Sequence, residues 1–571
     1  MQRRTFITMG ATTLGALPVM GLSALDGWPF MLPPAKPAWL VELVKLNDKN
    51  IEPLKLRQVQ AASHPAVGAI ADGDEIPSPQ ATGHFISMAA AAFSANESLY
   101  YRSADLLKNI AVAIQYLRHV QHPDGTIDLL STNFHSPPDT AFSVELLAPA
   151  YHLIKSSNAD GASPVLSALQ TYLQKAGESL IVGGIHTPNH RWVVSAALSQ
   201  LNALWPDERY VKRAEQWLTE HIDLDADGQY TEKSTGGYTP LVNRVLITLS
   251  INLNNPGILE YVRKNLNMTM YYVHPNGEVV TEASSRQDKG TIGTMENYYF
   301  SYRYLALLDN NGEYAAMCRL IEKSCFPKLV NTLSAFLGTP FLWTGLPGSK
   351  ALPTSYTKAF PFSGVARIRR GNWDATLLSN NAGFLTFHKG SAVLQGMRLV
   401  ASFFGKGQFQ SADIQQEGGS WVLRSQLEGV YYQPYPTEGI DPLGDLSKMP
   451  RTNRTQSEIQ HLETIITITE MGSGINVDIE IHGTDRVPVS LELIFRKGGK
   501  FTGVEQHPGS PLAHLLKGNS GSYTMGNDTI RFGPGKAEHK GVQLRGGLPA
   551  TDSPAVYLTG FTPFKHTLQL S

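Results

Sequence analysis

The feature that most limits how this chain can fold is a change in hydrophobic periodicity near residue 350. Between residues 38 and 340, apolar side chains recur at three- and four-residue spacing, as in residues 106–117, which is typical of amphipathic helices. After a Gly-, Pro- and Thr-rich segment the spacing becomes two residues, as in residues 475–481, which is typical of half-buried strands. The sequence therefore predicts a multidomain α+β protein, with a helical domain at residues 25–350 and an antiparallel β-sandwich at residues 351–571.

A weak internal repeat indicates how the helices are arranged. A glycine turn, followed by a polar loop and a new helix, recurs roughly every 50 residues, at Gly125, Gly184, Gly228 and Gly277. This period suits one helical hairpin with one loop. Hairpins that stack and close on themselves form an (α/α) toroid, in which all such loops open on one rim. The alternative is a set of unrelated helices joined by ordinary glycine turns.

The first 24 residues are typical of an export signal. A basic start with Arg3 and Arg4 precedes an apolar run of small residues that ends at Ala24, and this run is too short to span a membrane. The Arg-Arg-x-Phe-Ile pattern resembles the twin-arginine signal, and an ordinary secretory signal is the alternative. No later segment is long and apolar enough to span a bilayer. We therefore expect a bacterial protein of the periplasm or cell surface with no membrane partner.

The net charge argues against nucleic-acid and membrane binding, and the cysteine spacing argues against a disulfide. The 48 basic and 49 acidic residues give a net charge of −1, so no global field attracts nucleic acid or an anionic membrane. Any charged ligand must be held by a local cluster. In one helix, the Cα atoms of Cys318 and Cys325 would lie roughly 10 Å apart, which is beyond the reach of a disulfide. We expect both to be buried thiols.

A dense polar cluster opens one of the predicted helices. Asn189, His190, Arg191 and Trp192 directly precede a run of apolar residues with helical spacing. The free N–H groups and the dipole of a helix N-terminus favour anions, so we expect the first three side chains to face an anionic ligand and Trp192 to stack on that ligand. The competing interpretations are a helix cap for Asn189, a structural histidine for His190 and a core position for Trp192.

Three further loops carry side chains that a single rim would bring together. They contribute His135 with Asp139, then Tyr230 with Tyr238, and then Arg286. This set contains few paired carboxylates, so it suits the stabilisation of an anion and the removal of a proton better than hydrolysis by two carboxylates. Structural roles remain open for the two residues of the first loop, for Arg286 as a surface ion pair and for Tyr238 as an ordinary aromatic residue.

Several features together resemble the toroid-plus-sandwich polysaccharide lyases. They are the order of the two domains, the Asn189-His190 pair at the start of a helix, and the stretch Asp-Gly-x-x-x-Glu-x-Ser-x-x-x-Tyr from Asp227 to Tyr238. This group includes heparinase II/III-like enzymes, exolytic alginate lyases and rhamnose–glucuronate lyases. The architecture resembles these enzymes over nearly the whole mature chain, whereas the motifs cover only residues 183–240.

The resemblance implies a role for individual residues. In that family an Asn and a His neutralise the carboxylate of a uronic acid, and a Tyr transfers the proton. This assigns Asn189 and His190 to the carboxylate and Tyr238 to the proton, with a nearby arginine favouring the phenolate. Tyr230 is the competing base. Related enzymes also use a histidine from the sandwich, for which His388 is the candidate.

One acidic turn resembles half of a calcium-binding loop. Asp223, Asp225 and Asp227 match the pattern Asp-x-Asp-x-Asp-Gly, but Ser234 stands where a calcium loop has glutamate. No Cys/His set has the spacing of a structural zinc site. We therefore expect no metal and no other cofactor, with calcium at these three carboxylates as the alternative.

The sequence as a whole predicts a polysaccharide lyase. We expect it to bind an acidic polysaccharide and to cleave the bond at C4 of a uronic acid by β-elimination, in an exolytic mode because bulky loop side chains would close one end of the cleft. A glycoside hydrolase acting on uronides through Asp139 with Glu232 or Asp227 is one alternative. A non-catalytic glycan-binding protein is the other. The identity of the uronate and the oligomeric state stay open.

Overall fold

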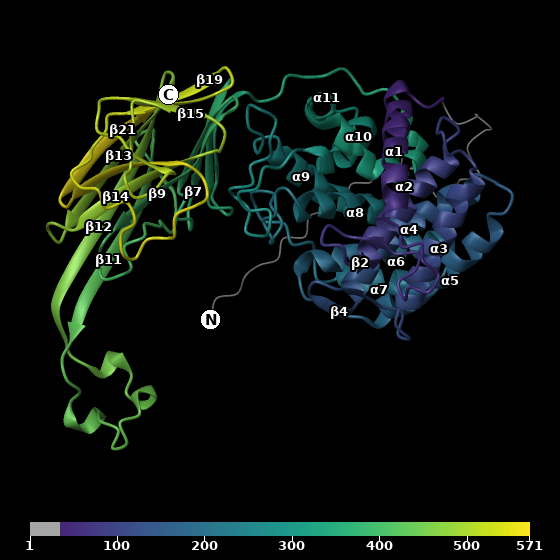
Figure 1. Ribbon diagram of the computed structural model, residues 1–571, viewed down its shortest axis with the longest axis horizontal. Coiled ribbons are helices and arrows are strands. Elements are labelled where there is room, and N and C mark those ends of the chain that lie inside the picture. The colour runs from purple at the N-terminus through teal and green to yellow at the C-terminus, as the bar shows by residue number, and fades with distance from the viewer. Residues whose placement is uncertain (1–34) are drawn as a thin grey trace, which may run out of the picture.

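A helical domain and a β-sandwich lie side by side in the computed structural model, which describes residues 35–571 (Figure 1). The predicted export signal at residues 1–24 lies outside the described residues. The last helical element ends at Trp343 and the first sandwich strand begins at Ser355. None of the helices in the described part combines the length and apolar character that a membrane-spanning helix needs. The predicted fold class, an (α/α) toroid followed by a β-sandwich, is confirmed.

The helical domain consists of α-helices, short 3₁₀ helices and two small hairpins. The α-helices are α1 (Ala38–Leu56), α2 (Pro79–Ser94), α3 (Ala104–Val120), α4 (Pro137–Ser156), α5 (Ser163–Val182), α6 (Pro188–Leu204), α7 (Glu208–Leu218), α8 (Tyr238–Asn252), α9 (Leu259–Thr269), α10 (Tyr299–Leu308), α11 (Gly312–Cys325) and α12 (Leu333–Gly338). The 3₁₀ helices are η1 (Pro256–Ile258), η2 (Glu296–Tyr298), η3 (Phe326–Thr332) and η4 (Pro340–Trp343). The hairpins pair β1 (Ile70–Ala71) with β2 (Pro77–Ser78) and β3 (Ile127–Leu129) with β4 (Asn133–Ser136).

The even-numbered helices form the inside of the helical domain. α2 packs on α4, α4 on α6, α6 on α8 and α8 on α10. Most residues of α2, α4 and α6 are buried, whereas the outer helix α7 buries only Tyr210 and Ala214. This distribution is expected, because a helix that is apolar all round belongs in the interior and an amphipathic helix belongs at the surface. Trp39 of α1 packs edge-on against Tyr299 of α10, with the centroids of the two aromatic rings 6.1 Å apart. This contact connects the N-terminal helix to a helix near the end of the toroid.

The glycine repeat corresponds to a recurring loop at three of its four positions. Gly125, Gly228 and Gly277 have φ values of 90°, 97° and 85°, and each donates its N–H to the carbonyl three residues earlier. An L-residue is strained at this φ, and a Cβ at Gly125 would lie 2.1 Å from the carbonyl oxygen of Lys175. Gly184 differs, because its φ is not positive and open space surrounds it. The predicted order of glycine, polar loop and new helix is present here between α5 and α6, but the backbone conformation of the other three turns is not.

The sandwich packs two sheets face to face. One has the order β10 (Gln415–Glu417), β11 (Ser420–Tyr432), β12 (Gln456–Met471), β13 (Gly474–Gly483), β21 (Phe564–Leu570), β19 (Asp528–Gly533), β18 (Gly521–Met525) and β15 (Lys500–Thr502). The other has the order β16 (Glu505–Gln506), β17 (Ala513–Leu515), β20 (Ala555–Phe561), β14 (Pro488–Phe495), β9 (Ala392–Ala401), β8 (Leu385–Lys389), β7 (Trp373–Leu378), β6 (Val365–Arg370) and β5 (Ser355–Phe360). The pairings are antiparallel except between β17 and β20.

Strands β5 to β8 bring the sandwich against the helical domain. The alternating residues predicted for β13 do alternate between buried and half-buried positions, and the buried ones join the core between the sheets. Near the boundary a separate small apolar cluster combines Tyr272 and Val280 of the helical domain with Phe360 and Leu378 of the sandwich. The two domains therefore share apolar contacts as well as the polar contacts described below.

The two cysteines lie in the interior of the helical domain. Cys318 and Cys325 belong to α11, and both are free and buried. This confirms the prediction of buried thiols.

Candidate active site

The polar cluster at the start of α6 is held by a carboxylate from a different loop. Asn189 is the second residue of α6, whose N-cap is Thr187, so Asn189 does not cap the helix. The backbone N–H and the Nδ2 of Asn189 donate to Glu232 Oε1 over 2.9 and 2.6 Å. The positive end of the helix dipole is therefore already offset by an internal anion. A ligand meets the side chains of this turn, not its free N–H groups.

The orientation of the Asn189 amide follows from these contacts. Nδ2 also donates to Thr187 Oγ1 over 3.2 Å, so both amide hydrogens are used. The reverse orientation would place Oδ1 against the Glu232 carboxylate, where two oxygen acceptors would face each other without a hydrogen. Oδ1 is buried and has no hydrogen-bond partner. Asn189 consequently offers an acceptor atom to a ligand.

His190 is a buried imidazole whose Nδ1 is unpaired. Its ring meets the ring of His186 edge-on with centroids 4.7 Å apart, and Phe142 lies on another side at 6.1 Å. Burial and the electrostatic influence of His186 and Arg286 lower its pKa to about 4, although Asp139 acts in the opposite direction. His190 is therefore neutral at pH 7. Its Nδ1 has no hydrogen-bond partner.

Tyr238 and Arg286 complete this group. Tyr238 is the first residue of α8, and the guanidinium of Arg286 lies over its ring, 5.2 Å from the centroid. Arg286 Nε is 3.6 Å from Glu232 Oε2, and no hydrogen bond from its Nη groups is found within residues 35–571. Glu232 thus connects Arg286 to Asn189. We call Asn189, His190, Glu232, Tyr238 and Arg286 the active-site cluster.

Asp288 fixes the two loops that carry Tyr238 and Arg286. Its carboxylate accepts hydrogen bonds from the hydroxyls of Ser234 and Ser284 and from the N–H of Gly236, over 2.8 to 2.9 Å. Ser234 in turn accepts from the N–H of Tyr238 over 3.0 Å. One carboxylate therefore positions both loops, which were predicted to meet only because the repeat placed them on one rim. The sequence analysis did not identify Asp288 or assign Glu232 this bridging role.

Three residues that were expected to bind substrate lie outside the active-site cluster. The Nη groups of Arg191 donate to Glu220 and Asp223, and Trp192 is fully buried and donates Nε1 to Asp223 over 2.9 Å. Tyr230 is buried and donates its hydroxyl to Asn243, and burial raises its pKa well above the usual value. Successive helical residues point about 100° apart, so residues after His190 turn towards the core and the outer helices.

The first loop contributes one residue near the cluster and one at its periphery. Asp139 is buried, accepts from Ser136 and Asn133, and acts electrostatically on His190. His135 has a positive φ of 48° and an exposed side chain. Its Nδ1 lies 2.8 Å from Asp124, and its ring is stacked on that of His122 at 3.7 Å. The hairpin is therefore rigidly held, with His135 facing solvent.

The acidic turn does not gather its carboxylates around one point. Asp223 accepts from Arg191, Trp192 and Thr231, while Asp225 accepts from the N–H of Gln229. Asp227 accepts from the N–H of Ser363 in the sandwich over 2.8 Å, and burial raises its pKa. Each carboxylate thus serves a different structural contact, and Asp227 joins the two domains.

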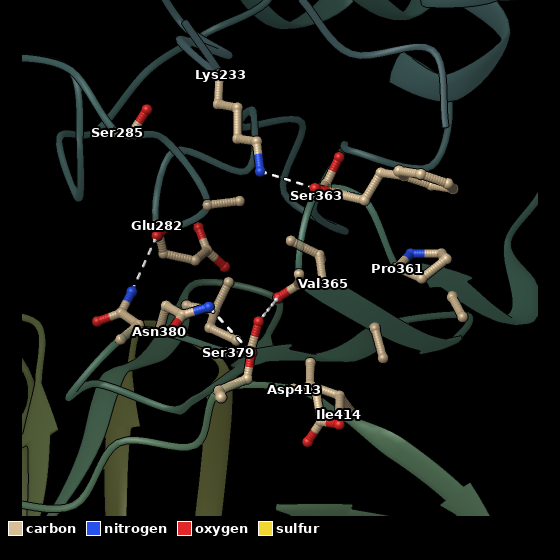
Figure 2. Close-up of a pocket in the computed structure, with 18 of the residues that line it drawn as sticks. Lys233, Glu282, Ser285, Pro361, Ser363, Val365, Ser379, Asn380, Asp413 and Ile414 are labelled. Atoms are coloured by element: carbon tan, nitrogen blue, oxygen red, sulfur yellow. Dashed lines mark hydrogen bonds between the residues drawn. The ribbon is translucent and has the colours of Figure 1, made fainter. Parts of the chain in front are cut away.

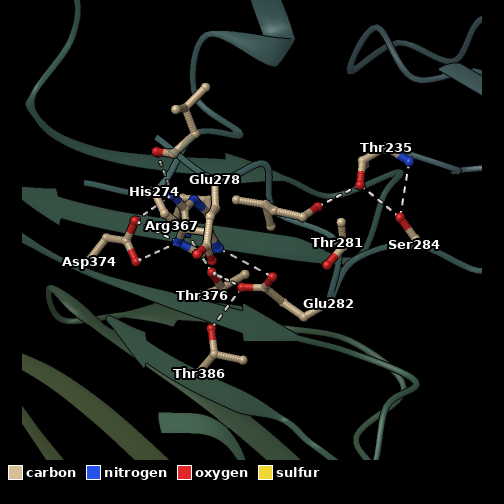
Figure 3. A network of polar contacts seen from close by, with 12 residues as sticks. Thr235, His274, Glu278, Thr281, Glu282, Ser284, Arg367, Asp374, Thr376 and Thr386 are labelled. Carbon is tan, nitrogen blue, oxygen red and sulfur yellow. Dashed lines mark hydrogen bonds and ion pairs between the residues drawn. The ribbon is translucent and has the colours of Figure 1, made fainter. Parts of the chain in front are cut away.

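His388 belongs to a second polar group at the boundary between the domains. Figure 3 shows four of its members, His274, Glu282, Arg367 and Asp374. Its ring is stacked on that of His274 at 3.6 Å. His274 Nδ1 lies 3.0 Å from Asp374, and its Nε2 lies 3.3 Å from Glu282. Arg367 donates to Asp374 over 2.8 Å, and both side chains are fully buried. We call these five residues the interface network. No hydrogen bond or ion pair within the described residues joins it directly to Asn189, His190 or Tyr238.

Charge proximity shifts the pKa values of the interface network strongly. Burial alone would lower the pKa of His274, but the carboxylates of Asp374 and Glu282 raise it to about 9. Burial and the adjacent His274 lower the pKa of His388 to about 3. The neighbouring cations hold the pKa values of both carboxyl groups below their usual range.

The residues that could hold a metal are in the interface network. Potential ligand atoms of His274, Asp374 and His388 all lie within 4.8 Å of one another, and His388 Nδ1 is buried without a partner. Two imidazoles and a carboxylate are a donor set that suits zinc. The sequence analysis named only His388 of this set, because 100 residues separate His274 from Asp374.

A cavity of about 310 Å³ lies between the domains next to the active-site cluster (Figure 2). Lys233 and Ser285 line it, and these residues follow Glu232 and precede Arg286 in the chain. The N–H of Ser285 donates to the backbone carbonyl of Lys233, and the hydroxyl of Ser285 donates to the backbone carbonyl of Glu232. The two paired loops that carry Glu232 and Arg286 therefore also line the interdomain cavity.

Comparison with known proteins shows a shared fold at low sequence identity. No protein-family model matches the sequence, and no curated protein matches it. The chain is similar to heparinase III, with a TM-score of 0.54 and 12% identity over 95% of this chain and 87% of that one. It is also similar to the chondroitin AC lyase of Streptomyces coelicolor A3 in complex with chondroitin sulphate, with a TM-score of 0.54 and 12% identity over 95% and 80% of the two chains.

A third solved structure extends beyond the region that it shares with this chain. The Paenibacillus xanthan lyase has a TM-score of 0.57 and 11% identity, and the match covers 93% of this chain but 57% of that one. All three comparisons span both domains of the present chain. The fold predicted from the resemblance to toroid-plus-sandwich polysaccharide lyases is therefore confirmed.

Proposed function

We propose that this protein is a polysaccharide lyase that cleaves a uronic-acid-containing glycan by β-elimination. The observation that carries the proposal is the active-site cluster, in which a phenol, a guanidinium, an imidazole and an amide converge from three loops. The proteins with which the chain shares its fold are named heparinase III, chondroitin AC lyase and xanthan lyase, and these names support the same reaction class.

In the proposed reaction Tyr238 moves the proton. Its phenolate oxygen takes the hydrogen from C5 of the uronate, and the C5–H electron pair becomes the C4=C5 double bond. The bond between C4 and the glycosidic oxygen breaks, and the leaving oxygen takes a proton from the Tyr238 hydroxyl. No water is consumed, and the tyrosine returns to its starting state. One product carries an unsaturated uronate at its new non-reducing end.

The other cluster residues stabilise the charge that forms on the substrate. Removing the C5 proton delocalises negative charge into the uronate carboxylate, and contacts that strengthen with this charge accelerate the step. Arg286 provides a fixed positive charge beside Tyr238, and neutral His190 provides a hydrogen-bonding nitrogen. Asn189 contributes its free Oδ1 as an acceptor, for a substrate hydroxyl or for a proton shared with the carboxyl group. This differs from the donor role that the resemblance implies for Asn189.

The contacts of the carboxylates favour elimination over hydrolysis. A glycoside hydrolase needs two carboxyl groups free to act on opposite sides of the scissile bond. Asp139 accepts hydrogen bonds from Ser136 and Asn133, and Glu232 holds Asn189 and Arg286. Asp227 is bound to the backbone of Ser363. Each of the three candidates for hydrolysis is thus engaged in holding the loops together.

Incubation with a panel of uronate polysaccharides tests the proposal. A lyase gives products with the ultraviolet absorbance of a C4=C5 double bond conjugated to the carboxylate. A hydrolase would give new reducing ends without that absorbance, and a glycan-binding protein would give neither. The size distribution of early products tests the exolytic mode, because exolytic cleavage releases small products while the polymer stays long.

A further inference from the structure

Strands β11 and β12 continue beyond the sandwich as a two-stranded ribbon. They pair from Trp421 with Ile468 to Tyr432 with Gln456, whereas β13 pairs with β12 only from Leu462 onward and β10 covers only residues 420–422 of β11. Residues 428–461, which we call the arm, therefore project away from both domains (Figure 1). Both outer edges of the ribbon lack a neighbouring strand within the described chain.

The end of the arm has a defined structure of its own. It contains η5 (Thr437–Gly439), η6 (Leu446–Lys448) and η7 (Arg451–Asn453). The guanidinium of Arg454 lies over the ring of Tyr435 at 3.8 Å, and the hydroxyl of Tyr435 donates to the carbonyl of Met449, a residue that is 8% exposed. These contacts preserve the shape of the tip.

The arm presents large apolar side chains to solvent. Leu443 is 88% exposed, Leu446 71%, Tyr431 59% and Ile440 53%. An isolated two-stranded ribbon is marginally stable in water, and clustered exposed apolar residues indicate an interaction surface. The arm therefore requires a partner to bury these residues.

The charges of the tip are divided between two consecutive segments of opposite sign. Residues 437–446 contain Glu438, Asp441 and Asp445 and no basic residue, whereas residues 447–454 contain Lys448, Arg451 and Arg454 and no acidic residue. Lys448 already lies 3.6 to 3.8 Å from the two aspartates, but Glu438 and Arg451 are exposed. A two-fold axis between two arms would place the acidic segment of each against the basic segment of the other.

We propose that the arm joins two copies of this chain in an isologous dimer. In a two-fold interface the same surface contacts itself, which suits a surface that carries both charges and two free strand edges. A stable interface involves about 20–30 residues on each side, and the arm from residue 428 to residue 461 is long enough to supply them. The inference does not depend on the proposed enzymatic activity.

Replacement of the tip tests the proposal directly. Residues 434–454 are exchanged for an Asn-Gly turn in the mature chain, since Gln433 and Thr455 are already joined by a backbone hydrogen bond of 2.9 Å and this turn suits a hairpin. We expect the mature chain to sediment as a dimer and the shortened chain, still folded, as a monomer. A monomeric mature chain, or a shortened chain that remains dimeric, would overturn the proposal.

A charge exchange distinguishes a two-fold arm contact from other uses of the arm. Glu438→Lys and Arg451→Glu, each alone, should weaken self-association at least tenfold, and mixing the two variants should restore a mixed dimer. Failure of the mixture to associate would contradict the proposed pairing. If tip replacement instead lowers retention on an acidic polysaccharide and leaves the mass unchanged, the arm binds glycan and the dimer proposal is wrong.

Discussion

The interface network and the active-site cluster are both polar and largely buried, but they use their polar atoms differently. The interface network contains a fully buried ion pair and the strongest pKa shifts of the two groups, and most of its polar atoms are paired, with His388 Nδ1 as an exception. The active-site cluster leaves Asn189 Oδ1, His190 Nδ1 and Glu232 Oε2 buried without a hydrogen-bond partner. Shifted pKa values alone would have indicated a functional site in the interface network, at the boundary between the domains.

Unpaired buried polar atoms are concentrated in the active-site cluster rather than in the interface network. Such atoms cost free energy in the free protein, and a substrate that pairs with them recovers that cost. Shifted pKa values arise equally in structural ion pairs. Under the proposed function the interface network serves stability and the active-site cluster serves chemistry, and each role is open to a separate test.

The largest expected effect is the loss of elimination in Tyr238→Phe. The substitution removes the proton-transferring oxygen and keeps the ring under Arg286, so we expect kcat to fall about 100- to 10,000-fold, the usual contribution of acid–base catalysis. Substrate binding, measured by calorimetry on the variant, should change little. The matched control is Tyr230→Phe, whose hydroxyl binds Asn243 in the core. It should lose about 1 kcal/mol of stability and keep kcat, and the reverse pattern would exchange the roles of the two tyrosines.

Asp374→Asn should lower the stability of the protein and leave catalysis almost unchanged. It leaves the fully buried guanidinium of Arg367 without its anion, and breaking one side of a buried ion pair costs about 3–5 kcal/mol. We expect this loss in the denaturant unfolding transition, with kcat/KM on the folded protein within twofold. Asp552→Asn is the control, because that side chain is 86% exposed in its pair with Lys497. It should cost less than about 1 kcal/mol.

Glu232→Gln should produce an intermediate effect on activity. The amide oxygen of Gln still accepts from Asn189, but the neutral side chain no longer pairs with Arg286, so the loss should be about 1–3 kcal/mol, or roughly 10- to 100-fold in kcat/KM. Because Glu232 acts through its neighbours, Glu232→Asp should recover part of the loss. If Glu232→Gln were as inactive as Tyr238→Phe, Glu232 would be a catalytic residue in its own right.

The last prediction concerns the pH dependence of stability and His190. Its pKa is about 4 in the folded chain against 6.5 in the unfolded one, so the unfolded state binds protons first as the pH falls. The contribution of His190 to stability is therefore fully present above pH 6.5 and is lost as the pH falls through about 4. Unfolding measured across this range should depend less on pH in His190→Gln than in the parent chain. An identical pH dependence would place His190 in a more hydrated site.

Much of the fold follows from the sequence because it depends on local periodicity. The change in spacing near residue 350 separates the two domains, and the turns at Gly125, Gly228 and Gly277 mark repeated loops that only a residue tolerant of positive φ can form. Gly184 has the same sequence context without that backbone conformation. A sequence pattern cannot distinguish a glycine that is required from one that is merely tolerated.

The sequence predicted only those site residues that lie on the loops of the glycine repeat. Asn189, His190, Tyr238 and Arg286 come together because the repeat places their loops on one rim. Trp192 was misplaced because the helix turns its side chain to the opposite face. The interface network was missed almost entirely, since its contacts join strands and loops that are far apart in the sequence. Long-range pairing of this kind leaves no local signal.

Cleavage in water labelled with heavy oxygen tests the central claim most directly. Elimination takes no atom from water at the broken bond, so mass spectrometry of the first products should show an unsaturated uronate end and no heavy oxygen at the new reducing end beyond that introduced by its spontaneous exchange. Incorporation of one heavy oxygen per cleavage, in products without the double bond, would identify a hydrolase. That result would contradict the assignment of proton transfer to Tyr238 and of charge stabilisation to the active-site cluster.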